Sequence, residues 1–309
     1  MASAGASAWA FPHRPVKLVV SSPPGGGADM MARAFAQRFG ERLGQAVYIE
    51  NVPGASGAIA ARAVLRSSPD GHTLFVGVTS DLITTPLTSE NADYDHRRFA
   101  AIAKLGGTPL VLVTSPATGW TTVDRVIDIA RQAPLRHSVA LSGSTALSAF
   151  AVAQLMATSH AQFLQIPYQG AAPATAALLS HQVDLALLPL SVVYPHAKSG
   201  RVVALGLLAD TRTPLLPDVP TLGESKRAKG VNVEIWAALL GPRGMPVDVV
   251  QSLNGVVRSV LVDRAFVDQR TKLGETPAAP MSAAETTSFI DAEEARYAAM
   301  IRRMGRSAR

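Results

Sequence analysis

The chain has 309 residues, of which 48% are hydrophobic and 17% charged, so it can build a folded core and is not intrinsically disordered. At roughly 150 residues per domain, this length indicates about two domains. The sequence contains no cysteine, which excludes disulfides, thiolate metal sites and cysteine nucleophiles. The net charge is +6, but the basic residues are scattered and aromatic residues make up only 6%, which favours a solvated basic surface over a nucleic-acid site.

The first ten residues have the composition of a leader. Met1–Ala10 is rich in alanine and serine, and Ala8-Trp9-Ala10 has the A-x-A form of a signal-peptidase site. We therefore expect residues 1–10 to be the remnant of a secretory signal or a disordered leader. In the chain as a whole, no apolar run reaches the roughly 18–20 residues that a membrane-spanning helix needs.

Strand and helix patterns alternate through the first hundred residues. The β-branched run Val16–Ser21 predicts a strand, and apolar residues recur every three or four positions over Asp29–Leu43, which predicts a helix. The next expected elements are the strand Ala46–Glu50, the helix Ala58–Arg66 and the strand Thr73–Val78. This βαβαβ order predicts a parallel sheet with right-handed crossovers.

A second α/β series begins after an apolar strand expected at Leu110–Thr114. Its expected helices are Val123–Gln132, Thr145–Thr158, Ala172–Ser180 and Val192–Ser199. Its expected strands are Ser138–Leu141, Gln162–Pro167, Val183–Leu188 and Val202–Leu208. An extended apolar segment, Val231–Leu240, follows. Beyond Pro246 we expect helices to the end of the chain, most clearly at Asp248–Val262 and Ala283–Met304.

The two series predict two lobes joined by two apolar strands, near residues 112 and 236. Lobe 1 is expected to consist of residues 11–113 plus 235–309, and lobe 2 of residues 114–234. The C-terminal helices have no strand of their own to cover, so we expect them to pack on lobe 1.

The sharpest local signal is a glycine-rich loop between a strand and a helix, Ser22–Asp29 (SPPGGGAD). Glycines let a ligand approach the backbone, and unpaired N–H groups at a helix start bind anions. Met30 stands where a dinucleotide-binding fingerprint needs glycine, and no G-K-[ST] of a Walker loop follows. The loop is therefore either an anion site or a tight turn that binds nothing.

Patterns for catalysis are missing from the sequence. It contains no H-E-x-x-H, no G-x-S-x-G and no serine with lysine three residues later, and none of the 7 histidines stand three or four positions apart. We expect His72 and His181 at the surface and Asp184 in a turn or cap. Nucleophilic and metal catalysis are therefore unsupported.

Two loops of the second series also join a strand to a helix. They are Ser142–Thr145, with small hydroxyl residues, and Ile166–Pro173, with Tyr168 and Gln169 as polar groups. Each alone is typical of a helix cap or turn. Together with the glycine loop they place polar groups at the strand ends of both lobes, where open α/β sheets bind ligands. This pattern indicates an anion held in a cleft.

These motifs, in this order, resemble the Bug-type (Bordetella uptake gene) periplasmic solute-binding proteins, the receptors of tripartite tricarboxylate transporters, along nearly the whole chain. The matching segments are Phe11-Pro12, Pro15–Val20, Pro24–Asp29 with Arg33, Glu50–Gly57, Pro69–Leu74, Pro167–Pro173, Asp218–Glu224, Trp236, Gly241-Pro242 and Met245-Pro246.

The resemblance implies an α/β, two-lobed fold of the periplasmic-binding-protein type II kind, each lobe an open mixed sheet flanked by helices. It implies a periplasmic, monomeric, non-enzymatic receptor whose partners are a small organic acid and the membrane permease subunits. No catalytic residue, metal, cofactor or nucleic acid is expected. The alternative is an α/β enzyme that acts on a carboxylated substrate.

Carried over by position, the resemblance implies eleven uncharged ligand-binding residues. They are Pro24, Gly25, Gly26, Thr79 and Ser80 in lobe 1, and Ser142, Gly143, Ser144, Tyr168, Gln169 and Gly170 in lobe 2. A buried ammonium without a carboxylate partner is costly, so we expect a mono- or dicarboxylic acid rather than an amino acid unless Asp81 or Asp184 faces the cleft.

Overall fold

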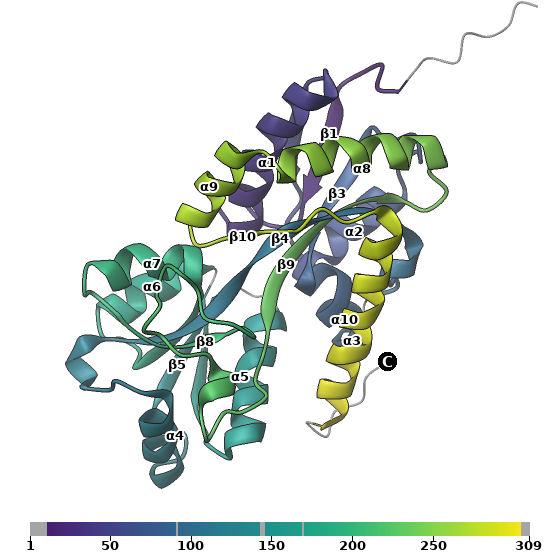
Figure 1. Ribbon diagram of the computed structural model, residues 1–309. Helices are drawn as coiled ribbons and strands as arrows, with labels where there is room; N and C mark the ends of the chain where they lie inside the picture. Colours follow the sequence, from purple (N-terminus) through teal and green to yellow (C-terminus); the bar gives the residue numbers. More distant parts are fainter. Residues whose placement is uncertain (1–10, 91, 143–145, 169, 304–309) are drawn as a thin grey trace, which may run out of the picture.

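The computed structural model describes residues 11–90, 92–142, 146–168 and 170–303, without the side chains of Ser142 and Ala146. Its strands form two groups with helices on both sides, and β4 and β9 run between the groups (Figure 1). Along the main path, the strand order is β2-β1-β3-β9-β4-β7-β5-β6.

In the first group, β1 (Val16–Val20) lies between β2 (Val47–Asn51) and β3 (Thr73–Val78) and is parallel to both. The connecting helices are α1 (Gly27–Leu43) and α2 (Ala58–Leu65). β1 is almost wholly buried, which explains why four of its five residues are apolar and three of them are valine. The predicted βαβαβ unit is confirmed.

Two long antiparallel strands, β4 (Phe99–Thr114) and β9 (Glu234–Pro242), connect the groups. β9 pairs with β3 and with β4 as far as Pro109, whereas Leu110–Thr114 of β4 pairs with the second group. The division into two lobes, expected after residue 113, is a proposal, and the change of pairing supports placing the first crossing at Pro109 and Leu110.

In the second group, β5 (Ser138–Ser142) is parallel to β6 (Leu164–Tyr168) and β7 (Leu185–Pro189), while β4 is antiparallel to β7 and β8 (Val203–Leu208). The helices of this group are α4 (Val123–Gln132), α5 (Ala146–Ser159), α6 (Ala171–Leu179) and α7 (Leu190–Lys198). Both groups are therefore open mixed sheets flanked by helices, as expected.

The C-terminal helices return to the first group (Figure 1). They are α8 (Val247–Leu261), α9 (Arg264–Lys272) and α10 (Ala283–Arg303). α8 packs on α1 and β4, α10 packs on β4, and α9 leads into the short strand β10 (Thr276–Pro277), which pairs with β4. Their expected packing on lobe 1 is confirmed, and α9 lies in the stretch beyond Pro246 that was expected to be helical.

Several short helical segments were not predicted. The π-helical turn η2 (Ser80–Thr84) and α3 (Thr85–Thr88) directly follow β3. The remaining ones are the 3-10 turns η1 (Ala55–Gly57), η3 (His96–Arg98), η4 (Pro116–Thr118) and η5 (Leu222–Glu224).

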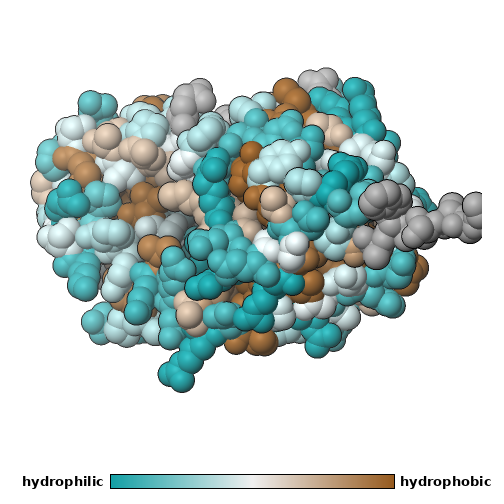
Figure 2. Space-filling view, turned by 90° about the horizontal axis from the view of Figure 1, so that it is seen from above, coloured by the Kyte–Doolittle hydropathy of each residue, from teal (hydrophilic) through white to brown (hydrophobic). Residues whose placement is uncertain are grey.

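The apolar residues are buried between the sheets and the helices. Phe35 and Phe39 of α1 stack with ring centroids 4.9 Å apart and pack in one cluster with Leu18 and Val20 of β1. Seen from above, the outer surface is mostly hydrophilic and its apolar residues lie in separate patches (Figure 2). The hydrophobic side chains therefore lie mainly in the core.

The prediction that His72 lies at the surface is wrong. Its side chain is 1% exposed, packs edge-on against Phe11 and His13, and directly precedes β3. Burial lowers the pKa of His72, because a charged imidazole would lose its hydration there. His181 is exposed, as expected.

Candidate functional site

The loop between β1 and α1 is organised by Asp29, a residue of the first helical turn. Its carboxylate is buried and accepts hydrogen bonds from the Gly25 N–H (2.9 Å), the Arg33 Nε (2.9 Å) and the Asn51 amide (2.8 Å). Burial opposes its ionisation, but the hydrogen bonds outweigh burial and hold the pKa of Asp29 below its ordinary value. Asp29 is therefore an internal anion that fixes the shape of the loop.

Two backbone N–H groups of the loop are already engaged. The Gly25 N–H donates to Asp29, and the Gly26 N–H donates to the Pro23 carbonyl oxygen at 3.0 Å. A side chain at Gly26 would place its Cβ 3.0 Å from the Ser22 Cβ and 3.1 Å from the Pro23 carbonyl oxygen. Gly26 therefore serves the close packing of the turn itself.

The free N–H groups lie at the next two positions. Gly27 and Ala28 begin α1, and neither N–H donates a hydrogen bond to any of the described residues. The first N–H groups of a helix have no partner within the helix and carry its positive dipole end, so they attract anions. The expected contacts Pro24, Gly25 and Gly26 thus stand directly before the available donors.

The hydroxyl of Thr79, directly after β3, connects β3 to β9. Its Oγ1 accepts from the Trp236 N–H at 2.8 Å and donates to the Glu234 carbonyl oxygen at 3.1 Å. Ser80 is also buried, and its Oγ is 3.4 Å from a carboxylate oxygen of Asp81. Both hydroxyls therefore have partners inside the protein.

Asp81 is buried at the same place. Its Oδ2 accepts from the Ser21 Oγ at 2.8 Å and from the Val78 N–H at 3.1 Å. Burial raises the pKa of Asp81 to about 7, although these hydrogen bonds act in the opposite direction.

Asp184, by contrast, stands before β7 and accepts from Ser138, the first residue of β5. Asp184 therefore lies at the end of this sheet opposite to its strand-to-helix loops.

In lobe 2, the described site residues lie at adjacent strand ends. Ser142 of β5 is paired with Tyr168 of β6, so both strands end at the same edge of the sheet. Gly170 precedes α6 with φ of +126°, a conformation that glycine adopts without strain. Gly143, Ser144 and Gln169 lie outside the described residues.

The two lobes meet where η2 packs on α5. Nearby, the rings of Phe150 on α5 and Tyr297 on α10 have centroids 5.3 Å apart. Thr84 of η2 and Ser148 of α5 are buried, and among the described residues their hydroxyls have no hydrogen-bond partner. Each can still bind a water or a solute atom. Sequence reasoning missed both, because a buried serine or threonine in a helix has no sequence signal.

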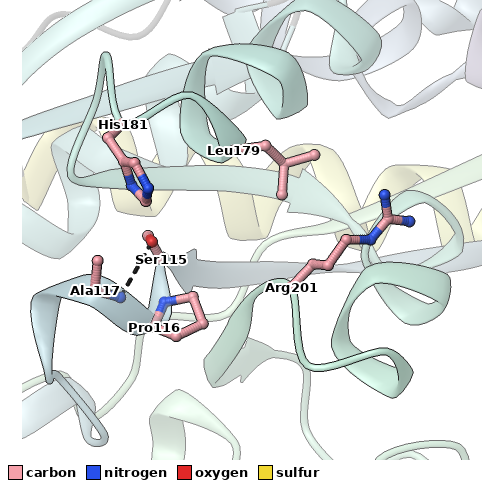
Figure 3. A pocket seen from close by; sticks show the side chains of 6 residues that line it. All are labelled: Ser115, Pro116, Ala117, Leu179, His181 and Arg201. Carbon is pink, nitrogen blue, oxygen red and sulfur yellow. Dashed lines mark hydrogen bonds between the residues drawn. The ribbon is translucent and has the colours of Figure 1, made fainter.

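A surface hollow lies elsewhere in lobe 2, beside Ser115 at the end of β4 (Figure 3). It is lined by Ser115, Pro116, Ala117, Leu179, His181 and Arg201. In Figure 3 the His181 ring points toward Ser115, which follows β4 at the end of the sheet where β7 begins. The hollow is therefore separate from the strand ends that carry the expected site residues. Within the described part of the chain, no cluster of three or more histidine and acidic residues could hold a metal ion.

Two mixed α/β sheets joined by two crossing strands, with helix starts at the strand ends, define a two-lobed solute-binding protein of the periplasmic-binding-protein type II kind. The model of the tripartite tricarboxylate transporter family receptor matches residues 31–306, so the chain belongs to this family. It is a solute-binding receptor of the Bug type, and the family consists of periplasmic transporter receptors.

Individual relatives cover almost the whole chain. BugT from Bordetella pertussis is 30% identical over 305 residues, which are 98% of this chain and 93% of BugT. The structure of R. palustris Rpa4515 with adipate has a TM-score of 0.88 at 28% identity and covers 96% of this chain and 99% of its own. MatC from Rhodopseudomonas palustris with bound malate has a TM-score of 0.85 at 28% identity, covering 94% and 100%. The expected family and fold are confirmed.

Among the helices that the structure describes, none combines the length and apolar composition required to cross a membrane.

Proposed function

We propose that the protein captures a small organic carboxylate between its two lobes in the periplasm and delivers it to the membrane subunits of a tripartite tricarboxylate transporter. The observation that carries this proposal is the pair of N–H groups of Gly27 and Ala28 at the start of α1, which have no partner in the described part of the chain. The nearby Arg33 forms an ion pair with Asp29, so the N–H groups rather than this guanidinium are available to bind the carboxylate of the solute. The relatives solved with adipate and malate support the same class of solute.

In this proposal the first carboxylate group of the solute lies against the start of α1. Pro24, Gly25 and Gly26 shape the approach, and Gly27 and Ala28 donate to it. Thr79 and Ser80 form the neighbouring wall of lobe 1. The lobe 2 contacts are the proposed residues Ser142, Gly143, Ser144, Tyr168, Gln169 and Gly170. We add the hydroxyl of Ser148, which has no hydrogen-bond partner among the described residues.

The distal part of the solute is expected to meet hydroxyl, amide and water groups rather than a charge. Asp184 is bonded to Ser138 at the opposite end of its sheet, whereas Asp81 accepts from Ser21 and Val78 at Oδ2 and from Ser80 at Oδ1. Neither carboxylate therefore offers a ready partner to an ammonium group, which favours simple carboxylic acids over amino acids.

A solute screen tests this proposal. Thermal stabilisation would be measured with adipate, malate and other mono- and dicarboxylates, and with amino acids and sugars as the contrasting classes. Stabilisation by carboxylates alone is expected, since a ligand that binds the folded state raises its stability by RT ln(1 + [L]/Kd). Stabilisation by amino acids or sugars alone would overturn the assignment of solute class.

We further propose that the bound acid is not converted, that the receptor acts as a monomer, and that it takes neither cofactor nor nucleic acid. Mass spectrometry of the acid after prolonged incubation should recover it unchanged, whereas a product peak would favour an enzyme. Sedimentation of the purified protein should give the mass of one chain. Cell fractionation of the producing bacterium should place the protein in the periplasm.

A further inference from the structure

The backbone pairing between β1 and β3 stops before the two strands reach the proposed site. Its last pair is Val20 with Val76, after which β1 leads to the glycine loop and β3 continues to Val78. Beyond this pair, the contacts that hold the two segments together must come from side chains.

Asp81 bridges this gap. One of its carboxylate oxygens, Oδ2, accepts from the hydroxyl of Ser21, the residue after β1, and from the N–H of Val78, the last residue of β3. The two donors are 2.8 and 3.1 Å from that oxygen. A single side chain thus continues the connection between the strands past the end of their ladder.

The bridge is sealed from water. Asp81 is 1% exposed, and a Cβ added to Gly57 would stand 1.9 Å from its Oδ1. The Tyr94 hydroxyl donates to the Asp81 carbonyl oxygen at 2.8 Å, which fixes the backbone as well. Asp81 is therefore held in one position by neighbours on several sides.

We propose that Asp81 is a positioning residue for the proposed solute site: its enclosed carboxyl group ties the start of the glycine loop to the end of β3 and makes the order of that loop depend on pH. This inference rests on the proposed function for its relevance to solute binding. The hydrogen-bonded link itself does not depend on which solute is bound.

The direction of the pH dependence follows from the enclosure. Burial raises the pKa of Asp81 to about 7, so the enclosed arrangement holds the proton more tightly than an opened, hydrated one. A proton on Oδ1 leaves Oδ2 able to accept both hydrogen bonds. Rising pH between about 4 and 7 therefore favours local opening.

Between about pH 4 and 7, Asp81 is the group of this cluster whose protonation is expected to change. Tyr94 faces it, and burial raises the pKa of Tyr94 above its ordinary value. Arg62 and Asp93 influence Tyr94 rather than Asp81. The groups that determine the pKa of Asp81 besides burial are the uncharged donors Val78, Ser21 and Ser80.

Hydrogen exchange followed by mass spectrometry on the solute-free protein tests the link, in peptides covering residues 21–29 and 79–88. Ser21→Ala removes one donor, and roughly tenfold faster exchange in residues 21–29 is expected from the loss of one hydrogen bond to a carboxyl group. Ser67→Ala is the matched control, because Ser67 follows α2 and its hydroxyl donates to the carbonyl oxygen of Val64 in that helix. Equal exchange in wild type and Ser21→Ala would overturn the link.

Asp81→Asn tests the pH dependence, because the amide oxygen can accept both bonds but the side chain does not titrate. The ratio of wild-type to Asp81→Asn exchange in residues 21–29 should rise roughly three- to tenfold per pH unit between pH 5 and 7 and level off above that. A ratio that is constant over this range would overturn the proposal. Since no solute is present, either failure is distinct from a negative solute screen.

Discussion

Replacing Gly27 by proline would remove one N–H group from the start of α1 while fitting the existing backbone. Proline is well tolerated at the first helical position, where the N–H has no helical acceptor. Gly26 before it has φ of −71° and ψ of 162°, the extended conformation that a residue preceding proline prefers. A Cβ at Gly27 meets no atom within 4 Å. The fold should therefore accept Gly27→Pro.

The expected loss of affinity follows from the hydrogen bond removed. A hydrogen bond to a charged group contributes about 1.5–3 kcal/mol, which corresponds to a roughly 10- to 150-fold weaker Kd. Gly27→Ala is the matched control, since it adds a methyl group in open space and keeps the N–H. Its Kd should stay within about threefold of wild type, and its stability within about 1 kcal/mol.

Isothermal titration calorimetry would measure both variants with the acid that stabilises the wild type most in the solute screen. Urea unfolding would confirm that Gly27→Pro is folded and as stable as wild type. Wild-type affinity in Gly27→Pro would show that the carboxylate does not lie at the start of α1. An equal loss in Gly27→Ala would trace the effect to bulk rather than to the N–H. A variant at Gly26 is less informative, because its side chain would press on Ser22 and Pro23.

Three further outcomes are expected. Gly57→Ala should lower the free energy of unfolding by roughly 2–5 kcal/mol, because the methyl group overlaps Asp81 and the φ of Gly57 is +91°. The control Gly255→Ala, in open space on α8, should cause no loss of stability in urea unfolding. Equal stabilities of the two variants would contradict the enclosure of Asp81. Wild-type stability relative to Asp81→Asn should fall by on the order of 4 kcal/mol as pH rises from about 4 to about 7, since the folded pKa of Asp81 is raised above the unfolded one; a flat difference would refute this. Small-angle scattering should show a smaller radius of gyration with saturating solute if the lobes close on it, and an unchanged radius would count against closure.

The elements that the sequence predicts well are those with a strong local pattern. β1 is recognised from its β-branched run, and α4 from its amphipathic repeat, which gives the bounds Val123–Gln132 that the structure has. The first half of β4 was missed because Lys104, Gly106 and Gly107 interrupt its pattern. Its extended conformation comes from pairing with β9, which is more than a hundred residues away in the chain.

The candidate site shows the same limit at the level of single atoms. The sequence predicts an anion site or a tight turn before α1, and the structure has two N–H groups there without a partner among the described residues. Which N–H groups are free depends on the buried carboxylate of Asp29, because it occupies the Gly25 N–H. The enclosure of Asp81 by Gly57 likewise depends on a contact between distant segments. Contacts of this kind, between residues that the fold brings together, produce no pattern in the sequence.

The continuity of β4 through both sheets restricts how the lobes can move relative to each other. A strand that is hydrogen-bonded into a sheet on each side of Pro109 cannot slide along its axis without breaking both ladders, but it can twist. Proline has no N–H, so the ladder has one bond fewer at the junction itself. The least costly deformation is therefore torsion about the β4 axis at this residue. The lobes would rotate in opposite senses about this axis as rigid bodies, and each binding loop would keep its conformation relative to its own sheet.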